Sequence, residues 1–293
     1  MYERFFQLSS KPFAMNPDPA FLFPSTQHAS ALTMLEYALE SHAPFCVLTG
    51  EIGSGKTTLL RHFLRAHDGS LTVGLISNTH AGFRSILPWA AAALGIAPVG
   101  ASETAQYESL IDFVVGEYGK GRRTLLVVDE AHNLSMALLE ELRLLSNVNS
   151  EQDLALQVFL VGQPELRDKL EQPALEQFAQ RVSVDFHLGS LTLEEVRAYV
   201  AHRLAVAGGH SSLFHPDAVA LIHARTRGIP RLINQLCDMA LVYAFAEQQT
   251  AVDARLLQVI LQDRKRRGAI SLFAGRPATA GSGADTGIGG IEV

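Results

Sequence analysis

Short apolar runs and helical repeats alternate along the first two thirds of the chain. The apolar runs lie at residues 45–50, 71–77, 123–130, 154–162 and 181–188. Apolar residues recur at helical spacing in the segments between and before them, at 26–42, from Lys56, near 82–95, at 103–119 and at 134–147. Apolar strands separated by helices predict a five-stranded parallel sheet that is covered on both faces. Thr26 is a candidate cap for the first helix.

The pattern changes after residue 190, where helical spacing is no longer interrupted by strands. Thr192 and Glu195 have the spacing of a capping box at the start of a helix. Further helical segments follow, and Gly228 and Gly268 are helix terminators. The last stretch is rich in Gly, Ala, Ser and Thr and is expected to be disordered. We therefore expect a sheet domain with the N-terminal segment at 1–190, a small all-α domain at 191–267 and a tail at 268–293.

A glycine-rich loop follows the first predicted strand. Gly50, Gly55, Lys56 and Thr57 satisfy the pattern G-x-x-x-x-G-K-[ST], between a strand and a helix. In such a loop the backbone amides and the helix N-terminus hold phosphate oxygens, the lysine reaches the β- and γ-phosphates, and the threonine binds Mg²⁺. The predicted nucleotide-binding residues are Gly50, Glu51, Ile52, Gly53, Ser54, Gly55, Lys56, Thr57 and Thr58. The fold class is therefore α/β, a P-loop NTPase, with ATP and Mg²⁺ as its cofactors.

Two acids follow the third predicted strand, in the sequence LLVVDE. This position brings Asp129 and Glu130 beside the phosphate loop. Asp129 would hold Mg²⁺ together with Thr57, and Glu130 would orient or deprotonate the attacking water. The alternative is that the two acids only cap the next helix. The run DEAH also occurs in one class of helicases, which needs two sheet domains, and this chain has room for one. His132 is interpreted as a local hydrogen-bonding residue.

Three further polar residues indicate which class of P-loop NTPase the chain resembles. Gln163 follows the fourth strand and either contacts the attacking water and the γ-phosphate or caps a helix that begins at Pro164. Arg181 begins the fifth predicted strand, where an ordinary surface ion pair is the alternative. Arg231 lies beside Pro230 at a helix start, where a cation is unfavourable unless an anion lies nearby.

The order of these motifs resembles the AAA+ ATPases, and more closely the general secretion pathway A type, whose relatives serve pilus biogenesis and exosortase-linked systems. The resemblance covers roughly residues 1–265. Its signatures are FFQLSSKPFAMNPDPAFLFPS, LTGEIGSGKTTLLR, LLVVDEAHNL, LVGQPELRDKL, FAQRVSVDFHLGSLTLEEVRAYVAHRL and RGIPRLINQLCDMAL. Long members of this type continue into a membrane span and a peptidoglycan-binding domain, and those functions are not carried over.

The resemblance implies a role for each matching residue. Gln163 matches the sensor-1 position, Arg231 the sensor-2 position in a helical lid, and Arg181 the arginine finger that acts on a neighbouring subunit's nucleotide. The N-terminal aromatic segment is expected near the adenine, with core packing as the alternative; its members are Phe5, Phe6, Pro12 and Phe13.

Composition and charge limit the partners. Hydrophobic residues make up 47% of the 293 residues and charged residues 18%, as in a globular protein. The net charge of −6 argues against a main role in coating nucleic acid. Cys46 and Cys237 are interpreted as core residues. Residues 86–101 are the best membrane candidate, but Pro88, Gly95 and Pro98 break the run. A cytoplasmic location, with peripheral contact to the inner membrane, is expected.

The sequence thus predicts an ATPase that works as a homo-oligomer, whose assembly could depend on nucleotide, and that drives or times a cell-envelope system such as secretion, pilus assembly or exopolysaccharide export. Its partners would be proteins of that system. One alternative is a DNA-bound regulator of the transposition type, for which 263–268 is the dense basic run. Another is a nucleotide-dependent switch with little turnover, against which Glu130 argues.

Overall fold

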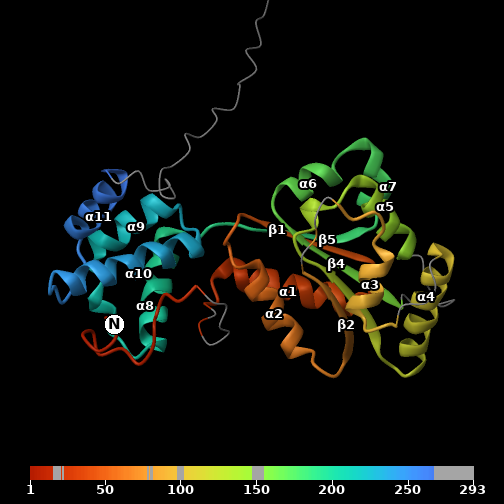
Figure 1. The fold of residues 1–293 in the computed structure, drawn as a ribbon, viewed down its shortest axis with the longest axis horizontal. Helices are drawn as coiled ribbons and strands as arrows, with labels where there is room; N and C mark the ends of the chain where they lie inside the picture. The colour runs from red at the N-terminus through yellow and green to blue at the C-terminus, as the bar shows by residue number, and fades with distance from the viewer. Residues whose placement is uncertain are drawn as a thin grey trace, which may run out of the picture.

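The protein has two lobes in the computed structural model, a lobe built on a sheet and a lobe of helices (Figure 1). The structure describes residues 1–15, 21, 23–77, 79, 82–97, 102–146 and 155–266. The predicted tail at 268–293 lies outside the described residues, as does the predicted helix end at Gly268. The division into these two lobes follows the change of pattern near residue 190.

The sheet has five parallel strands, as predicted. They are β1 (Phe45–Gly50), β2 (Leu71–Ile76), β3 (Arg123–Val128), β4 (Leu156–Gly162) and β5 (Val182–Leu188). Their order across the sheet is β2-β3-β4-β1-β5. Because all strands run the same way, the loops after β1, β3 and β4 meet at one edge of the sheet. The predicted strand bounds hold to within two residues.

Helices cover both faces of the sheet. On one face lie α1 (Thr26–Glu40) and α2 (Lys56–Ala66). On the other lie α3 (Leu87–Ala93), α4 (Glu103–Gly119), α5 (Met136–Leu145), α6 (Glu165–Leu170) and α7 (Glu176–Ala179). Successive residues of β1 alternate between these two cores: Phe45 and Val47 enter one, and Cys46 and Leu48 enter the other. This double burial explains why residues 45–48 of β1 are all apolar.

Two local predictions were wrong. The cap of α1 is Ser25, whose hydroxyl accepts the His28 N–H, and Thr26 is already helical. The helix predicted near 82–95 begins only at Leu87. Before it, the carboxylate of Glu141 accepts the Ile86 N–H and the Ser85 hydroxyl, which holds residues 85–86 outside the helix.

The second lobe consists of α8 (Leu193–Val206), α9 (Pro216–Thr226), α10 (Pro230–Ala246) and α11 (Ala254–Arg266). The predicted capping box of Thr192 and Glu195 is present at the start of α8. The second carboxylate oxygen of Glu195 also accepts the Thr26 N–H at 3.2 Å. One side chain therefore joins the first turns of α8 and α1, where the two lobes meet.

The N-terminal segment packs on the helical lobe and not on the sheet with which the sequence analysis grouped it. Tyr2, Leu8 and Phe13 lie in the core formed by α8 to α11. Arg203 of α8 donates through Nε to the Pro12 carbonyl (2.6 Å) and through Nη2 to the Ala14 carbonyl (3.1 Å). These carbonyls are satisfied by a side chain because the segment forms no strand or helix of its own.

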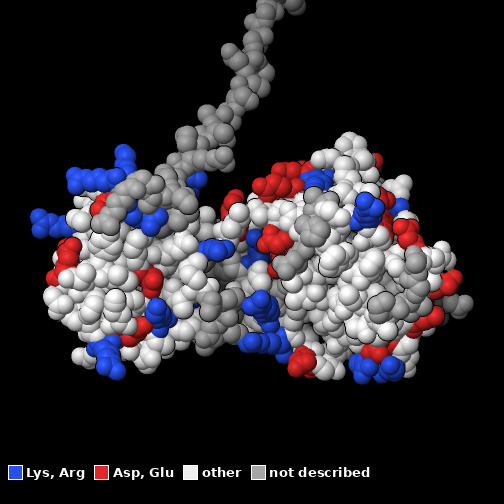
Figure 2. Space-filling model, in the orientation of Figure 1, with Lys and Arg blue, Asp and Glu red and all other residues white. Residues whose placement is uncertain are grey.

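Acidic and basic side chains alternate in small groups over both lobes on the face shown in Figure 2. Among the described residues, no helix is long and apolar enough to span a bilayer. Cys46 and Cys237 are both buried free thiols, as predicted.

Glu117 joins the end of α4 to strand β2. Its carboxylate accepts from Lys120 Nζ (2.8 Å), Thr72 Oγ1 (2.5 Å) and Arg122 Nε (2.7 Å), and these donors lower its pKa to about 2. A lowered pKa stabilises the fold above the carboxyl's ordinary pKa of 4.5, and this contribution is lost as pH falls toward 2.

We expect Glu117→Gln to lower the free energy of unfolding at pH 7, with a difference from wild type that shrinks between pH 4.5 and pH 2. Urea unfolding at several pH values measures this. Glu108→Gln, at an exposed position of the same helix, should leave stability unchanged. A difference that is constant over the whole pH range would contradict the linkage.

Candidate nucleotide-binding site

The phosphate loop lies at the wall of a cavity of about 560 Å³ between the two lobes. The predicted residues Ile52, Gly53, Gly55, Lys56, Thr57 and Thr58 line it, together with Glu130, Gln163 and Arg231. The sheet edge supplies the loop, Glu130 and Gln163, while α10 supplies Arg231. The fold thus brings together residues that are up to 179 positions apart, from 52 to 231.

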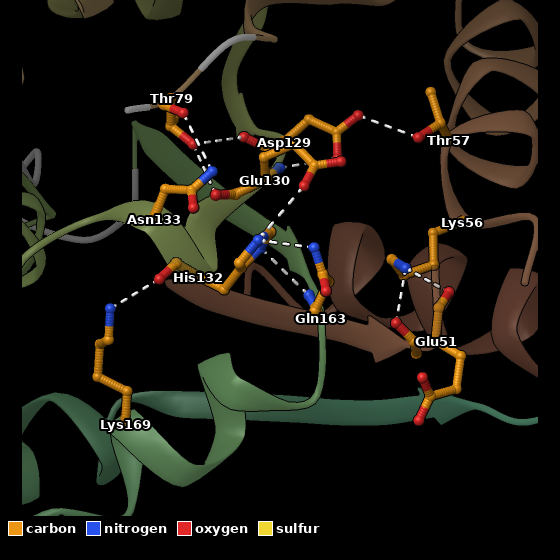
Figure 3. Close-up of polar contacts among 11 residues, drawn as sticks. Glu51, Lys56, Thr57, Thr79, Asp129, Glu130, His132, Asn133, Gln163 and Lys169 are labelled. Atoms are coloured by element: carbon orange, nitrogen blue, oxygen red, sulfur yellow. Dashed lines mark hydrogen bonds and ion pairs between the residues drawn. The ribbon is translucent and has the colours of Figure 1, made fainter. Parts of the chain in front are cut away.

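Lys56 is buried at the start of α2, with 8% of its surface exposed. Its Nζ donates to the carbonyls of Gly50 (2.7 Å) and Glu51 (3.0 Å), so the ammonium folds back over the loop (Figure 3). Burial lowers the pKa of Lys56, and the carboxylates of Glu130, Asp129 and Glu51 oppose this shift. A phosphate in the loop would offer the ammonium a stronger acceptor than the two carbonyls.

Thr57 and Asp129 form the pair that was predicted to bind Mg²⁺. The Thr57 hydroxyl donates to Asp129 Oδ2 at 3.1 Å. Asp129 is 6% exposed, and burial raises its pKa despite hydrogen bonds from Thr57 and the Glu130 N–H. A hydroxyl and a carboxylate in contact are a hard-oxygen donor set of the kind that Mg²⁺ prefers.

Glu130 lies in a strained turn directly after β3. Its φ of 56° is in the left-handed region, which costs a non-glycine residue roughly 1–2 kcal/mol. The Glu130 carbonyl accepts from the Thr79 hydroxyl (2.6 Å) and the Asn133 N–H (3.0 Å), and the Glu130 N–H donates to Asp129 Oδ1 (2.9 Å). These bonds hold the turn against its strain. The Glu130 side chain remains 48% exposed and lines the cavity.

Gln163 comes from the end of β4 and does not cap α6. Its side-chain amide lies 2.8 Å from His132 Nε2 and lines the cavity. The helix instead begins at Glu165, with Pro164 before it and no side-chain cap. Glu130 Oε2 lies 3.5 Å from the same His132 Nε2. The side chains of Glu130, His132 and Gln163 therefore lie together in Figure 3.

The helical lobe contacts the phosphate loop directly. The Arg231 N–H, in the first turn of α10, donates to the Gly53 carbonyl at 3.2 Å. Gly53 has a φ of 83°, and a Cβ there would lie 2.4 Å from Arg231 Cβ. Glycine is therefore required at this position, both by the backbone conformation and by the closeness of the lid.

Part of the remaining wall of the cavity is an aromatic wall, formed by Phe21, Phe23 and Tyr199. The other residues of the remaining wall are Ala14, Met15, His28, Leu191, Arg203, Pro230 and Asn234. The Arg203 guanidinium lies 4.5 Å from the centre of the Phe21 ring, and the Tyr199 hydroxyl donates to Asn234 Oδ1 (2.9 Å). His28 contacts the loop, since a Cβ on Gly55 would lie 2.7 Å from its Nε2, and burial lowers the pKa of His28.

The N-terminal aromatics predicted near the adenine do not line this cavity. Phe13 packs on Phe214 and Phe5 on Phe245, with ring centres 5.7 and 5.5 Å apart. Phe6 packs against the same helical core. Core packing, the alternative interpretation, is correct for these residues. The aromatics that face the cavity are Phe21 and Phe23, a few positions further along the chain.

Arg181 is not among the residues that line the cavity of its own subunit. Its guanidinium donates from Nη1 to the Arg143 carbonyl (3.2 Å) and to Ser146 Oγ (3.1 Å), at the end of α5. These contacts hold the side chain beside the sheet lobe and leave it outside the described site.

The residues present fit a bound nucleotide. Ser54 Oγ is buried in the loop and, among the described residues, has no hydrogen-bond partner. A buried hydroxyl without a partner is costly unless a ligand completes it. Together with the Lys56 ammonium and the Thr57–Asp129 pair, it forms a set of groups suited to phosphate oxygens and a divalent cation.

Several residues of the site were missed by sequence reasoning, among them Thr79, Asn133, His28 and Arg203. For Arg203 a signal existed: it lies on the buried stripe of α8, with Val196, Tyr199, Val200 and Leu204. A charged residue in an apolar stripe predicts a buried partner. Thr79 gave no such signal, because its role depends on the backbone of the turn at residue 130.

Comparison with known proteins agrees with the class of protein that the sequence motifs predict. A family model described as an AAA domain matches residues 39–170. The chain is also 40% identical over 250 residues to General secretion pathway protein A of Aeromonas hydrophila. The matched region covers 84% of this chain and 45% of that protein. The chain thus contains an AAA domain and is similar to general secretion pathway protein A, and the predicted resemblance is confirmed. It spans about half the length of this curated relative.

Solved structures support the fold. The Aeropyrum pernix ORC2 protein, in its ADPNP-ADP complexes, matches with a TM-score of 0.62 and 17% identity over 88% of this chain and 72% of that one. Drosophila ORC bound to DNA matches with a TM-score of 0.64 and 15% identity, over 88% of this chain and 66% of that chain. At such low sequence identity, these structural matches show a shared fold and nothing further. The P-loop and the AAA domain together indicate nucleotide binding.

We expect Gly53→Ala to weaken nucleotide binding roughly tenfold or more, because it adds a positive-φ penalty and a clash with Arg231. Titration with a fluorescent ATP analogue measures this. Gly121→Ala is the matched control, since Gly121 has a φ of 76° but open space around its Cβ. Equal affinities for the two variants would show that closeness to the lid does not matter.

Proposed function

We propose that the chain is a Mg²⁺-dependent ATPase that hydrolyses ATP as an oligomer and drives or times the assembly of a cell-envelope system. The observation that carries this proposal is the convergence of Lys56, Thr57, Glu130 and Gln163 on one cavity. Asp129 is hydrogen-bonded to Thr57, and Arg231 of the lid lies beside the loop. The aromatic wall of the same cavity suits a nucleobase.

Each residue has a defined task in this proposal. Lys56 exchanges its two carbonyl partners for phosphate oxygens. Glu130 accepts a proton from the attacking water, and the Gln163 amide holds that water in line. Arg231 binds the γ-phosphate from the lid. Mg²⁺, held by Thr57 and Asp129, would neutralise charge on the phosphate oxygens.

An oligomer is proposed because Arg181 lies outside the cavity of its own subunit. An arginine that completes a neighbour's site raises hydrolysis by roughly 10³–10⁵. The likeness to general secretion pathway protein A supports a role in secretion or a related envelope system, with protein partners. The cytoplasmic location and peripheral contact with the inner membrane stay predictions.

The first experiment measures the ATPase rate per subunit against protein concentration. We expect the rate to rise with concentration and to fall at least ~10²-fold in Glu130→Gln, with ATP binding retained, since Glu130 acts as the base. A rate that is independent of concentration and equal in both proteins would instead favour a switch with little turnover. Stimulation by duplex DNA in the same assay would favour the DNA-bound regulator.

We expect Arg181→Ala to lose hydrolysis by roughly 10³-fold without losing ATP affinity, because its own cavity is intact. Mixing it with Lys56→Ala should restore part of the activity, since the Lys56 variant supplies an intact arginine to the site of the Arg181 variant. Arg197→Ala, which removes an exposed ion pair with Glu194, is the control. Mixtures as inactive as the separate variants would contradict action between subunits.

A further inference from the structure

His132 is the side chain that joins the proposed base to the proposed sensor. Its ring is 13% exposed, in the turn Ala131–Asn133 that follows β3. The Gln163 N–H lies 3.4 Å from Nδ1, while Nε2 faces both the Gln163 side-chain amide at 2.8 Å and Glu130 Oε2 at 3.5 Å. One ring nitrogen therefore faces two groups of the proposed hydrolytic site (Figure 3).

We propose that His132 is a positioning residue that couples Gln163 to Glu130, so that the rate of hydrolysis depends on it and nucleotide affinity does not; this inference rests on the proposed function. His132 touches neither the loop nor the proposed Mg²⁺ pair, and it is not among the residues that line the cavity. Its effect on the reaction would pass through its two partners.

The hydrogen-bonding roles follow from the ring's surroundings. A neutral imidazole has one donor and one acceptor nitrogen. The backbone N–H of Gln163 can only donate, so Nδ1 is the acceptor and the ring proton lies on Nε2. An N–H at Nε2 requires an acceptor, and an amide's oxygen and nitrogen have nearly the same shape, so the Gln163 amide is assigned with Oε1 toward the ring. The single N–H then faces two acceptors, that amide oxygen and the Glu130 carboxylate. When Gln163 turns its amide toward a γ-phosphate, the N–H is left to Glu130.

The ring cannot easily move away from this position. Lys169 of α6 donates to the carbonyls of His132 (2.7 Å) and Leu134 (2.6 Å), which ties the turn to the helix that follows Gln163. Gly162 lies on the other side, and a Cβ there would come within 3.2 Å of the His132 N–H nitrogen. The end of β4 and the turn after β3 are therefore packed against each other, and His132 is a side-chain contact between them.

As a consequence, the direction of the Glu130 carboxylate depends on the position of the Gln163 amide. Glu130 is half-exposed, and its side chain has the freedom to point into the cavity or away from it. An N–H that is shared with Gln163 holds Glu130 near the ring before nucleotide binds. Release of the amide by a γ-phosphate would strengthen the hold on Glu130 and fix its direction toward the water.

The test compares His132→Phe, which keeps the ring shape without a donor, with His132→Gln, whose amide restores an N–H at similar reach. Steady-state ATPase assays and titration with a fluorescent ATP analogue are run on both, in the full chain. We expect kcat to fall roughly tenfold or more in His132→Phe, with unchanged affinity and melting temperature, since a hydrogen bond to a charged group is lost. His132→Gln should recover most of that loss.

Two controls make the result specific. His67→Phe removes another histidine–carboxylate pair, between His67 Nε2 and Glu36 Oε2 (2.7 Å), and should leave kcat unchanged. Adding His132→Phe to Glu130→Gln should lower the residual rate no further, because the partner is already gone.

A wild-type kcat in His132→Phe would overturn the coupling. An equal loss in His132→Phe and His132→Gln, together with a lower melting temperature or weaker affinity, would show that the residue only supports the fold, which also overturns it. A wild-type chain that turns over no faster than Glu130→Gln would overturn the proposed function itself, and this inference with it.

Discussion

The site depends on how closely the phosphate loop is packed by three separate elements. Cβ atoms at its glycines would lie 2.5 Å from the Leu188 carbonyl for Gly50, 2.7 Å from the His28 ring for Gly55 and 2.4 Å from Arg231 for Gly53. The sheet, α1 and the lid helix α10 thus each touch the loop. Because atoms of these neighbours occupy the space that a Cβ would need, glycine at the three positions allows the loop to pass this close to all three elements.

The N-terminal segment and α8 link the packing around the phosphate loop to both lobes. Arg203 holds the carbonyls of Pro12 and Ala14, and its guanidinium lies over the Phe21 ring. The same helix, α8, begins with the capping box whose Glu195 also bonds to the start of α1. A movement of the helical lobe would therefore carry the aromatic wall of the cavity with it and would pull at α1, on which His28 packs against the loop.

Sequence patterns predicted the elements well because burial on two faces leaves a strong signal, as in β1 and β3. They predicted the loop and the acids because strict spacing reflects strict geometry. They failed where a position is decided by distant contacts: the Glu141 carboxylate shortens α3, and the buried core of α8 to α11 draws in Phe13. Arg181 and Arg231 show the limit of spacing, which placed both near helix or strand starts. The family resemblance alone distinguished Arg231, which lines the cavity of its own subunit, from Arg181, which does not.

The site has two halves with different physical character. Lys56 and Asp129 are buried, at 8% and 6% exposure, and their pKa values move toward the neutral forms because they are held away from water. Each is fixed by bonds within the sheet lobe, so this half is formed before any ligand arrives. Glu130 is exposed and stands on a strained turn, and Arg231 depends on the lid. Under the proposed function, a rigid binding half and an adjustable hydrolytic half would allow nucleotide to bind without being hydrolysed. Hydrolysis would then wait for lid closure and for a neighbouring subunit, which is the behaviour expected of a timing device.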